Sequence, residues 1–188
     1  KENKFGVSEK TFLNLVKYLK KSKNVNLKCL SVHIGSQILN NKPYEKMLKV
    51  LDRIIKKTKY HFDYIDLGGG MGIDYDNKNK NLNLKRYCSS IKKFIKNHNS
   101  KIIFEPGRSI IGDAGILISR IIYIKEGYKK NFIILDAAMN DLMRPALYDA
   151  KHRIIPLKKN NLKSNKVHEF VGPICESTDK FLTQKKFQ

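Results

Sequence analysis

Paired cysteines and long apolar runs are both missing from this sequence, and each absence excludes a class of protein. No apolar stretch approaches the roughly eighteen residues of a membrane-spanning helix, and residues 1–6 lack the apolar core of a signal peptide. Cys29, Cys88 and Cys175 are odd in number, far apart and without a Cys-x-x-Cys pair, which argues against a disulfide framework or a zinc site. We therefore expect a cytoplasmic protein with reduced cysteines, no bound metal and no membrane partner.

Acidic residues are also scarce, with 17 Asp and Glu against 38 Lys and Arg, which gives 188 residues a net charge of +21. Such an excess raises nucleic acid as a partner, because Lys and Arg bind phosphates. The lysines are spread through every segment, however, and no basic stripe is interleaved with aromatic residues. We expect solvated helix faces and no nucleic-acid partner, while a basic nucleic-acid-binding module stays an alternative that a salt-dependent gel shift would test.

Helical and strand patterns alternate in the first part of the chain. Apolar periodicity predicts helices at residues 8–21, 43–58 and 84–97. Short apolar runs predict strands at residues 27–34, 62–67 and 101–104. This alternation is typical of parallel α/β folds, in which ligands bind at the C-terminal ends of the strands.

After Gly115 the sequence pattern changes to apolar runs that are rich in β-branched residues. Strands are predicted within residues 116–124, 132–135 and 167–171, with a polar loop at residues 158–166. We place the break between Ser109 and Gly115, which gives domains at 1–111 and 112–188.

Each predicted strand of the first part ends in polar or glycine residues. The run from Gly68 to Gly70 would let the backbone approach a phosphate closely, although a tight turn explains it equally well. Glu105 and Arg108 bring a carboxylate and a guanidinium to the next strand end, where a structural salt bridge is the competing interpretation. His33 alone would more often be a satisfied loop histidine.

A thiol and a carboxylate lie side by side at Cys175 and Glu176, directly after Gly172 and Pro173. A thiol can give a proton to a carbanion, and a carboxylate can hold a cationic substrate. This pair suggests chemistry at the α-carbon of an amino acid. A small buried apolar cysteine is the competing interpretation.

Five motifs, in order, resemble those of the diaminopimelate decarboxylases, and the resemblance runs from near Lys4 to near Phe181. They are His-Ile-Gly-Ser-Gln at 33–37, Asp-Leu-Gly-Gly-Gly-Met-Gly at 66–72, Phe-Glu-Pro-Gly-Arg at 104–108, Met-Asn-Asp-Leu-Met-Arg-Pro-Ala-Leu-Tyr at 139–148, and Cys-Glu-Ser-Thr-Asp at 175–179. The resemblance implies a fold-type III enzyme that uses pyridoxal 5'-phosphate to convert meso-2,6-diaminopimelate into L-lysine and CO₂, the final step of lysine biosynthesis. It also implies a homodimer with shared active sites.

The resemblance assigns a cofactor role to residues at all three strand ends. His33 would stack on the pyridine ring, and Ser36 would hold the phosphate together with the glycine loop of Gly68, Gly69 and Gly70. Glu105 would face the pyridine nitrogen, where a carboxylate keeps that nitrogen protonated and strengthens the ring as an electron sink. The loop would continue through Pro106, Gly107 and Arg108.

The resemblance assigns substrate roles mainly to the second part of the chain. Arg108, Arg144 and Tyr148 would bind substrate, and two arginines suit a substrate with two carboxylates. Cys175 would protonate the α-carbon and Glu176 would contact the substrate amino group, both in the active site of the partner subunit. The family more often has glycine where Ser177 or Thr178 stands, a departure that leaves these roles in place.

The implied fold class is α/β: the last three strand-helix units of a (β/α)₈ TIM-type barrel, followed by part of a C-terminal β-domain. A complete barrel needs about 250 residues, so we expect a C-terminal fragment without the Schiff-base lysine, inactive when expressed alone. Two alternatives remain within the same superfamily. One is a related decarboxylase for another amino acid, of the carboxynorspermidine or D-amino acid type, and the other is a non-catalytic relative that binds pyridoxal phosphate.

Overall fold

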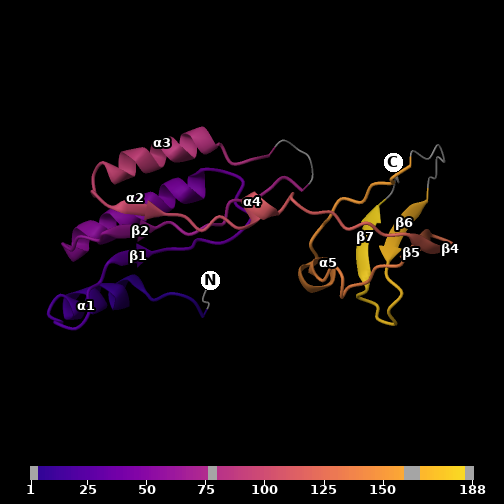
Figure 1. Ribbon diagram of the computed structural model, residues 1–188, viewed down its shortest axis with the longest axis horizontal. Helices are drawn as coiled ribbons and strands as arrows, with labels where there is room; N and C mark the ends of the chain where they lie inside the picture. Colours follow the sequence, from indigo (N-terminus) through magenta and orange to yellow (C-terminus); the bar gives the residue numbers. More distant parts are fainter. Residues whose placement is uncertain (1–3, 76–79, 159–165, 185–188) are drawn as a thin grey trace. The chain divides into compact units, whose positions relative to one another are not determined.

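The computed structural model describes residues 4–75, 80–158 and 166–184, so most of the predicted polar loop at 158–166 lies outside the described residues. The chain divides into two compact units, Lys1–Gly115 and Ile116–Gln188, which we call unit 1 and unit 2 (Figure 1). Each unit has its own cluster of buried apolar side chains.

Unit 1 contains a three-stranded parallel sheet of order β1-β2-β3, with helices before, between and after the strands in the chain (Figure 1). The strands are β1 (Cys29–Ser31), β2 (Tyr64–Asp66) and β3 (Lys101–Ile103). The helices are α1 (Glu9–Leu19), α2 (Lys42–Thr58), α3 (Leu84–Ile95) and α4 (Arg108–Ile111). The predicted α/β fold is confirmed.

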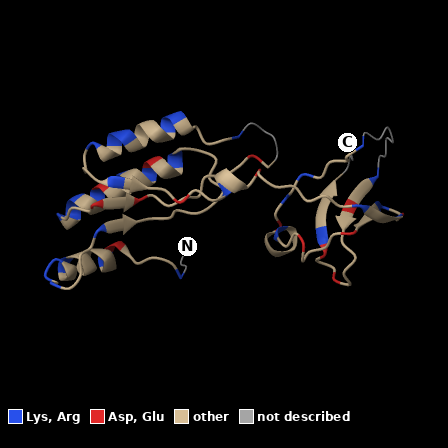
Figure 2. Cartoon of the chain, viewed as in Figure 1, with Lys and Arg blue, Asp and Glu red and all other residues tan. Residues whose placement is uncertain are grey.

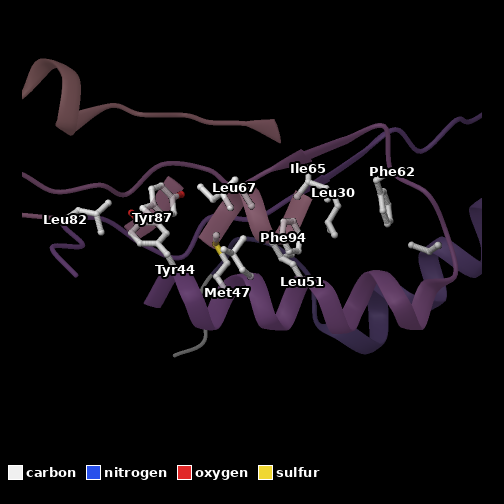
Figure 3. Close-up of a cluster of buried hydrophobic side chains, with 13 residues drawn as sticks. Leu30, Tyr44, Met47, Leu51, Phe62, Ile65, Leu67, Leu82, Tyr87 and Phe94 are labelled. Atoms are coloured by element: carbon white, nitrogen blue, oxygen red, sulfur yellow. The ribbon is translucent and has the colours of Figure 1, made fainter. Parts of the chain in front are cut away.

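The core of unit 1 follows from the amphipathic spacing of α2 and α3. Tyr44, Met47 and Leu51 recur at helical spacing on α2 and point toward the sheet residues Ile65 and Leu67 (Figure 3). All five side chains are buried. This packing holds the sheet against α2.

The strands are shorter than the apolar runs that predicted them. Pairing between β1 and β2 extends by one hydrogen bond at each end, from the Tyr64 amide to the Lys28 carbonyl and from the Val32 amide to the Asp66 carbonyl. Beyond Val32 the backbone turns, with Gly35 at φ +127° and Gln37 at φ +60°. Such positive angles cannot continue a strand.

Unit 2 contains a four-stranded sheet of order β4-β5-β6-β7. Its elements are β4 (Ile121–Lys125), β5 (Lys130–Leu135), the short helix α5 (Arg144–Tyr148), β6 (Val167–Val171) and β7 (Lys180–Gln184). The β5–β6 pair is parallel, and the other two pairs are antiparallel. The sequence patterns predicted neither β7 nor α5, since neither Lys-Phe-Leu-Thr-Gln nor Arg-Pro-Ala-Leu-Tyr contains a continuous β-branched run or a full helical repeat.

Strand β4 begins later than the apolar run at 116–124 predicted. The Asp136 carboxylate accepts hydrogen bonds from the Arg120 amide (2.7 Å) and the Ser119 hydroxyl (2.7 Å). This side chain thereby accepts a hydrogen bond that a main-chain carbonyl would accept within a sheet. Strand pairing starts only at Ile121, opposite Leu135.

Lys and Arg residues occur on helices, strands and loops of both units (Figure 2). No helix among the described residues is long and apolar enough to cross a membrane. The described ranges also contain no group of three or more His, Cys, Asp or Glu side chains that could hold a metal ion.

Candidate active site

The C-terminal ends of β1, β2 and β3 meet at one edge of the parallel sheet, where backbone hydrogen bonds join the loops that follow them. The Glu105 amide donates to the Gly68 carbonyl (2.8 Å), and the Ile38 amide donates to the Gly70 carbonyl (2.9 Å). The loops after all three strands are therefore held against one another by the main chain itself.

Glycine is required at each position of the Gly68–Gly70 run. Gly68 and Gly70 have φ of +64° and +86°, a region that other residues rarely adopt. A Cβ at Gly69 would overlap the Glu105 carbonyl oxygen, and one at Gly70 would overlap that of Gly35. Close packing of the loops thus explains the run without a ligand, but the half-buried Gly70 amide donates to none of the described residues and can still bind an anion.

A buried carboxylate supports the start of the glycine loop. Asp66, 8% exposed, accepts hydrogen bonds from the Gly68 amide (2.8 Å) and the Ser31 hydroxyl (3.1 Å). It links the ends of β1 and β2 through one side chain.

Two further side chains contact the Gly69 peptide. Tyr44 is fully buried on α2, and its hydroxyl donates to the Gly69 carbonyl (3.1 Å). Burial raises the pKa of Tyr44, so this hydroxyl keeps its proton. The Gly69 amide donates to Nδ1 of His33 at 3.4 Å, which orients the ring at the end of β1.

His33, Ser36 and Glu105 are all exposed at this edge. The ring of His33 is therefore accessible to a ligand, while its hydrogen bond with the Gly69 amide also agrees with the competing interpretation of a satisfied loop histidine. Glu105 forms none of the described ion pairs, so the salt bridge with Arg108 that the sequence allowed is not formed among the described residues.

Arg108 is held by Gln37, a residue to which sequence reasoning gave no role. The Arg108 guanidinium donates to Oε1 of Gln37 (3.0 Å), and that oxygen also accepts from the Ile73 amide (3.4 Å). The Gln37 amide group in turn donates to the Ile73 carbonyl (2.6 Å). Gln37 thus connects the loops after β1 and β2 to the start of α4.

In unit 2, Cys175 and Glu176 lie exposed on the loop between β6 and β7. The interpretation of Cys175 as a buried apolar residue is wrong for this chain. Hydrogen bonds from the Thr178 amide (3.4 Å) and the Ser177 hydroxyl (3.1 Å) lower the pKa of Glu176, so its carboxylate is ionised near neutral pH.

Arg144 and Tyr148 lie at the two ends of α5, four residues apart and so on the same side of the helix. The Arg144 guanidinium lies 3.3 Å from Nε2 of His152. Burial and the adjacent charge of Arg144 lower the pKa of His152, which favours a neutral ring as acceptor. Tyr148 is 70% exposed.

The predicted site residues thus lie on the strand-end loops of unit 1 and, in unit 2, on the β6–β7 loop and on α5. Sequence reasoning missed three side chains that support the group in unit 1, namely Gln37, Tyr44 and Asp66. An Asp side chain often accepts a hydrogen bond from the main-chain amide two residues further on, and Gly68 at that spacing could have indicated Asp66. Tyr44 carries no local signal, because its role depends on how α2 packs on the sheet.

The part of the chain that carries these strand-end loops matches a known class of cofactor-binding domain. Residues 1–112 match the pyridoxal-binding domain of pyridoxal-dependent decarboxylases. The chain therefore belongs to the pyridoxal-dependent decarboxylase family.

Comparison with individual proteins shows which members of this family the chain resembles. The chain is 42% identical over 181 residues to the diaminopimelate decarboxylase of Aquifex aeolicus, covering 95% of this chain and 43% of that protein. It is 38% identical over 183 residues to that of Neisseria meningitidis serogroup A, with coverage of 95% and 44%. The structure resembles diaminopimelate decarboxylase from Helicobacter pylori complexed with L-lysine, with a TM-score of 0.87 and 36% identity, covering 100% of this chain and 48% of that one. The chain spans less than half the length of these relatives.

Proposed function

We propose that these residues form part of a diaminopimelate decarboxylase, which converts meso-2,6-diaminopimelate into L-lysine and CO₂. The observation that carries the proposal is sequence similarity to diaminopimelate decarboxylases across 95% of the chain, and so across both groups of site residues. Unit 1 would supply the last three strand-helix units of a (β/α)₈ barrel, and unit 2 would supply part of the C-terminal β-domain. The remainder of the full-length enzyme would supply the lysine that binds the cofactor.

The residues at the strand ends of unit 1 fit pyridoxal phosphate. When bound, this cofactor withdraws the electron pair left on the α-carbon as CO₂ departs. The exposed imidazole of His33 would cover the pyridine ring, and the Glu105 carboxylate would hold a proton on its nitrogen. Ser36 and the glycine loop would bind the phosphate, a role that suits the Gly70 amide because it donates to no described residue. Pro106 and Gly107 would carry the chain past the cofactor to Arg108.

Two arginines, a tyrosine and a carboxylate would recognise the substrate. The guanidinium groups of Arg108 and Arg144 match the two carboxylates of diaminopimelate, since each can pair with a carboxylate in a bidentate way. Tyr148 would add a hydrogen bond beside Arg144. The ionised Glu176 would bind the ammonium group at the far end of the substrate.

Cys175 would complete the reaction by protonating the α-carbon. The bond from the α-carbon to the departing carboxylate breaks, the S–H bond of Cys175 breaks, and a new C–H bond forms. Water then returns a proton to the thiolate. In a homodimer, Cys175 and Glu176 would perform these steps in the active site of the partner subunit.

The test compares Cys175→Ala with Cys88→Ala, a matched change at another exposed thiol, in the full-length enzyme. We expect Cys175→Ala to slow lysine formation by about 100-fold or more while cofactor affinity stays the same, and Cys88→Ala to change neither. Equal losses of activity and cofactor affinity in Cys175→Ala would refute the proton-donor role. Absence of lysine formation by the unmodified enzyme would refute the proposed reaction.

A further inference from the structure

Asp179, at the end of the Cys175 motif, is a buried carboxylate with two main-chain partners. It is 3% exposed, and none of the described ion pairs includes it. One carboxylate oxygen accepts the Met139 amide (2.7 Å), and the other accepts the Ile174 amide (2.9 Å). Burying a carboxylate in this way is costly unless its hydrogen bonds are well formed, so the arrangement demands a specific geometry around it.

The loop between β6 and β7 closes around this carboxylate. The Gly172 amide donates to the Asp179 carbonyl (3.1 Å), and the Asp179 amide donates to the Glu176 carbonyl (3.0 Å). A Cβ at Gly172 would overlap the Asp179 carboxylate, which explains why the loop begins with glycine. Cys175 and Glu176 therefore lie on a loop whose shape depends on Asp179.

The second partner, Met139, belongs to the turn that leads into α5. This turn is itself ordered, because the Ala138 amide donates to the Asp141 carboxylate (2.9 Å) and the Leu142 amide donates to the Ala138 carbonyl (3.2 Å). Leu142 packs against the core of unit 2. A single carboxylate thus ties the loop of Cys175 to the segment that precedes Arg144.

We propose that Asp179 is a positioning residue that holds Cys175 and Glu176 in one fixed geometry on the loop between β6 and β7. This inference rests on the proposed function, in which Cys175 protonates the α-carbon and Glu176 binds the amino group of the substrate. A carboxylate suits the role because both of its oxygens accept hydrogen bonds, whereas asparagine offers one acceptor and turns an N–H₂ group toward the other amide.

Hydrogen exchange of the full-length enzyme tests the structural half of the proposal. In Asp179→Asn we expect the Met139 and Ile174 amides to exchange about 10-fold faster or more, with the amide of Ile133 in the core unchanged. The matched control is Asp136→Asn, which removes a similar capping carboxylate in the same unit and should leave both amides unchanged. Unchanged exchange at both amides in Asp179→Asn would overturn the proposal.

Kinetics test whether Asp179 acts through Cys175 or only stabilises the fold. We expect Asp179→Asn to lower kcat about 10-fold, but less than about 2-fold when Cys175 is already alanine, because interacting residues are not additive. The same factor in both backgrounds would overturn the positioning role. If Cys175→Ala alone leaves kcat unchanged, the proposed proton donor is wrong and the positioning role fails with it.

A second variant covers the case in which Asp179→Asn does not fold. Asp179→Glu keeps the charge but moves the carboxylate by one methylene. We expect this variant to fold and to show the same pattern, a lower kcat that depends on the presence of Cys175. Full kcat in Asp179→Glu would overturn the proposal, since a positioning carboxylate must stand at one place.

Discussion

Unit 1 and unit 2 hold their candidate site residues by different means. In unit 1 the loops after parallel strands bind one another through the main chain, as between Glu105 and Gly68. In unit 2 the loop of Cys175 is anchored by one carboxylate, Asp179, which binds two amides. The position of the first group follows from sheet topology, whereas the position of the second depends on individual side chains.

The two units also differ in how many apolar side chains they bury. Among the described residues, the core cluster of unit 1 has 13 buried side chains (Figure 3), against four in that of unit 2. Strand β4 is exposed along its whole length, with Tyr123 62% exposed. With little apolar burial to order its loops, unit 2 relies on hydrogen bonds and ion pairs, and its site should therefore respond more to single polar substitutions.

The largest effect is expected from Gly69→Ala in unit 1. The added methyl group would overlap the Glu105 carbonyl, and because that carbonyl is main chain in a joined loop, the strand ends would have to separate. We expect a loss of about 3 kcal/mol in the free energy of opening, measured by native-state hydrogen exchange at the buried Ile65 and Leu67 amides.

Gly115→Ala is the matched control for this change. A Cβ at Gly115 meets nothing within 4 Å, so we expect a change within about 0.5 kcal/mol. Equal effects at Gly69 and Gly115 would show that the strand-end loops yield easily and that topology does not fix this site.

A smaller effect is expected from Glu169→Gln in the sheet of unit 2. Glu169 is 6% exposed and forms ion pairs with Lys130 and with Lys180, the latter at 2.9 Å. Because both lysines are partly exposed to water, we expect a loss of about 1 to 2 kcal/mol, measured by hydrogen exchange at the Phe170 amide. The exposed Glu126 supplies the control, and Glu126→Gln should have no measurable effect.

This stabilisation by Glu169 should depend on pH. Burial raises its pKa, but the hydrogen-bonded pairs with Lys130 and Lys180 outweigh burial and hold the pKa below the ordinary value of 4.5. A lowered pKa in the folded state gives stability that is present above pH 4.5 and is lost as pH falls through the folded pKa. The difference between Glu169→Gln and the unmodified protein should therefore shrink in acid, and a constant difference would contradict the ion-pair explanation.

The same contrast explains what could be predicted from sequence. The α/β alternation and the strand ends of unit 1 could be predicted because apolar periodicity sets the elements and parallel pairing brings their ends to one edge. The anchoring roles of Gln37 and Asp179 could not be predicted, because their hydrogen bonds join residues far apart in the chain. Gln37 binds Ile73, 36 positions away, and Asp179 binds Met139, 40 positions away. Local patterns carry no signal for such contacts.

Tyr44→Phe gives the smallest expected effect and sharpens the contrast most directly. It removes the buried hydroxyl that donates to the Gly69 carbonyl, which should cost about 1 kcal/mol. The main-chain bonds of Glu105 and Ile38 would still join the loops, so their amides should exchange at unchanged rates. In unit 2, by contrast, Asp179→Asn replaces a single carboxylate and should release both of the amides that this carboxylate binds. Accelerated exchange at Glu105 and Ile38 in Tyr44→Phe would mean that unit 1, too, depends on a single side chain, and that the distinction between the two units fails.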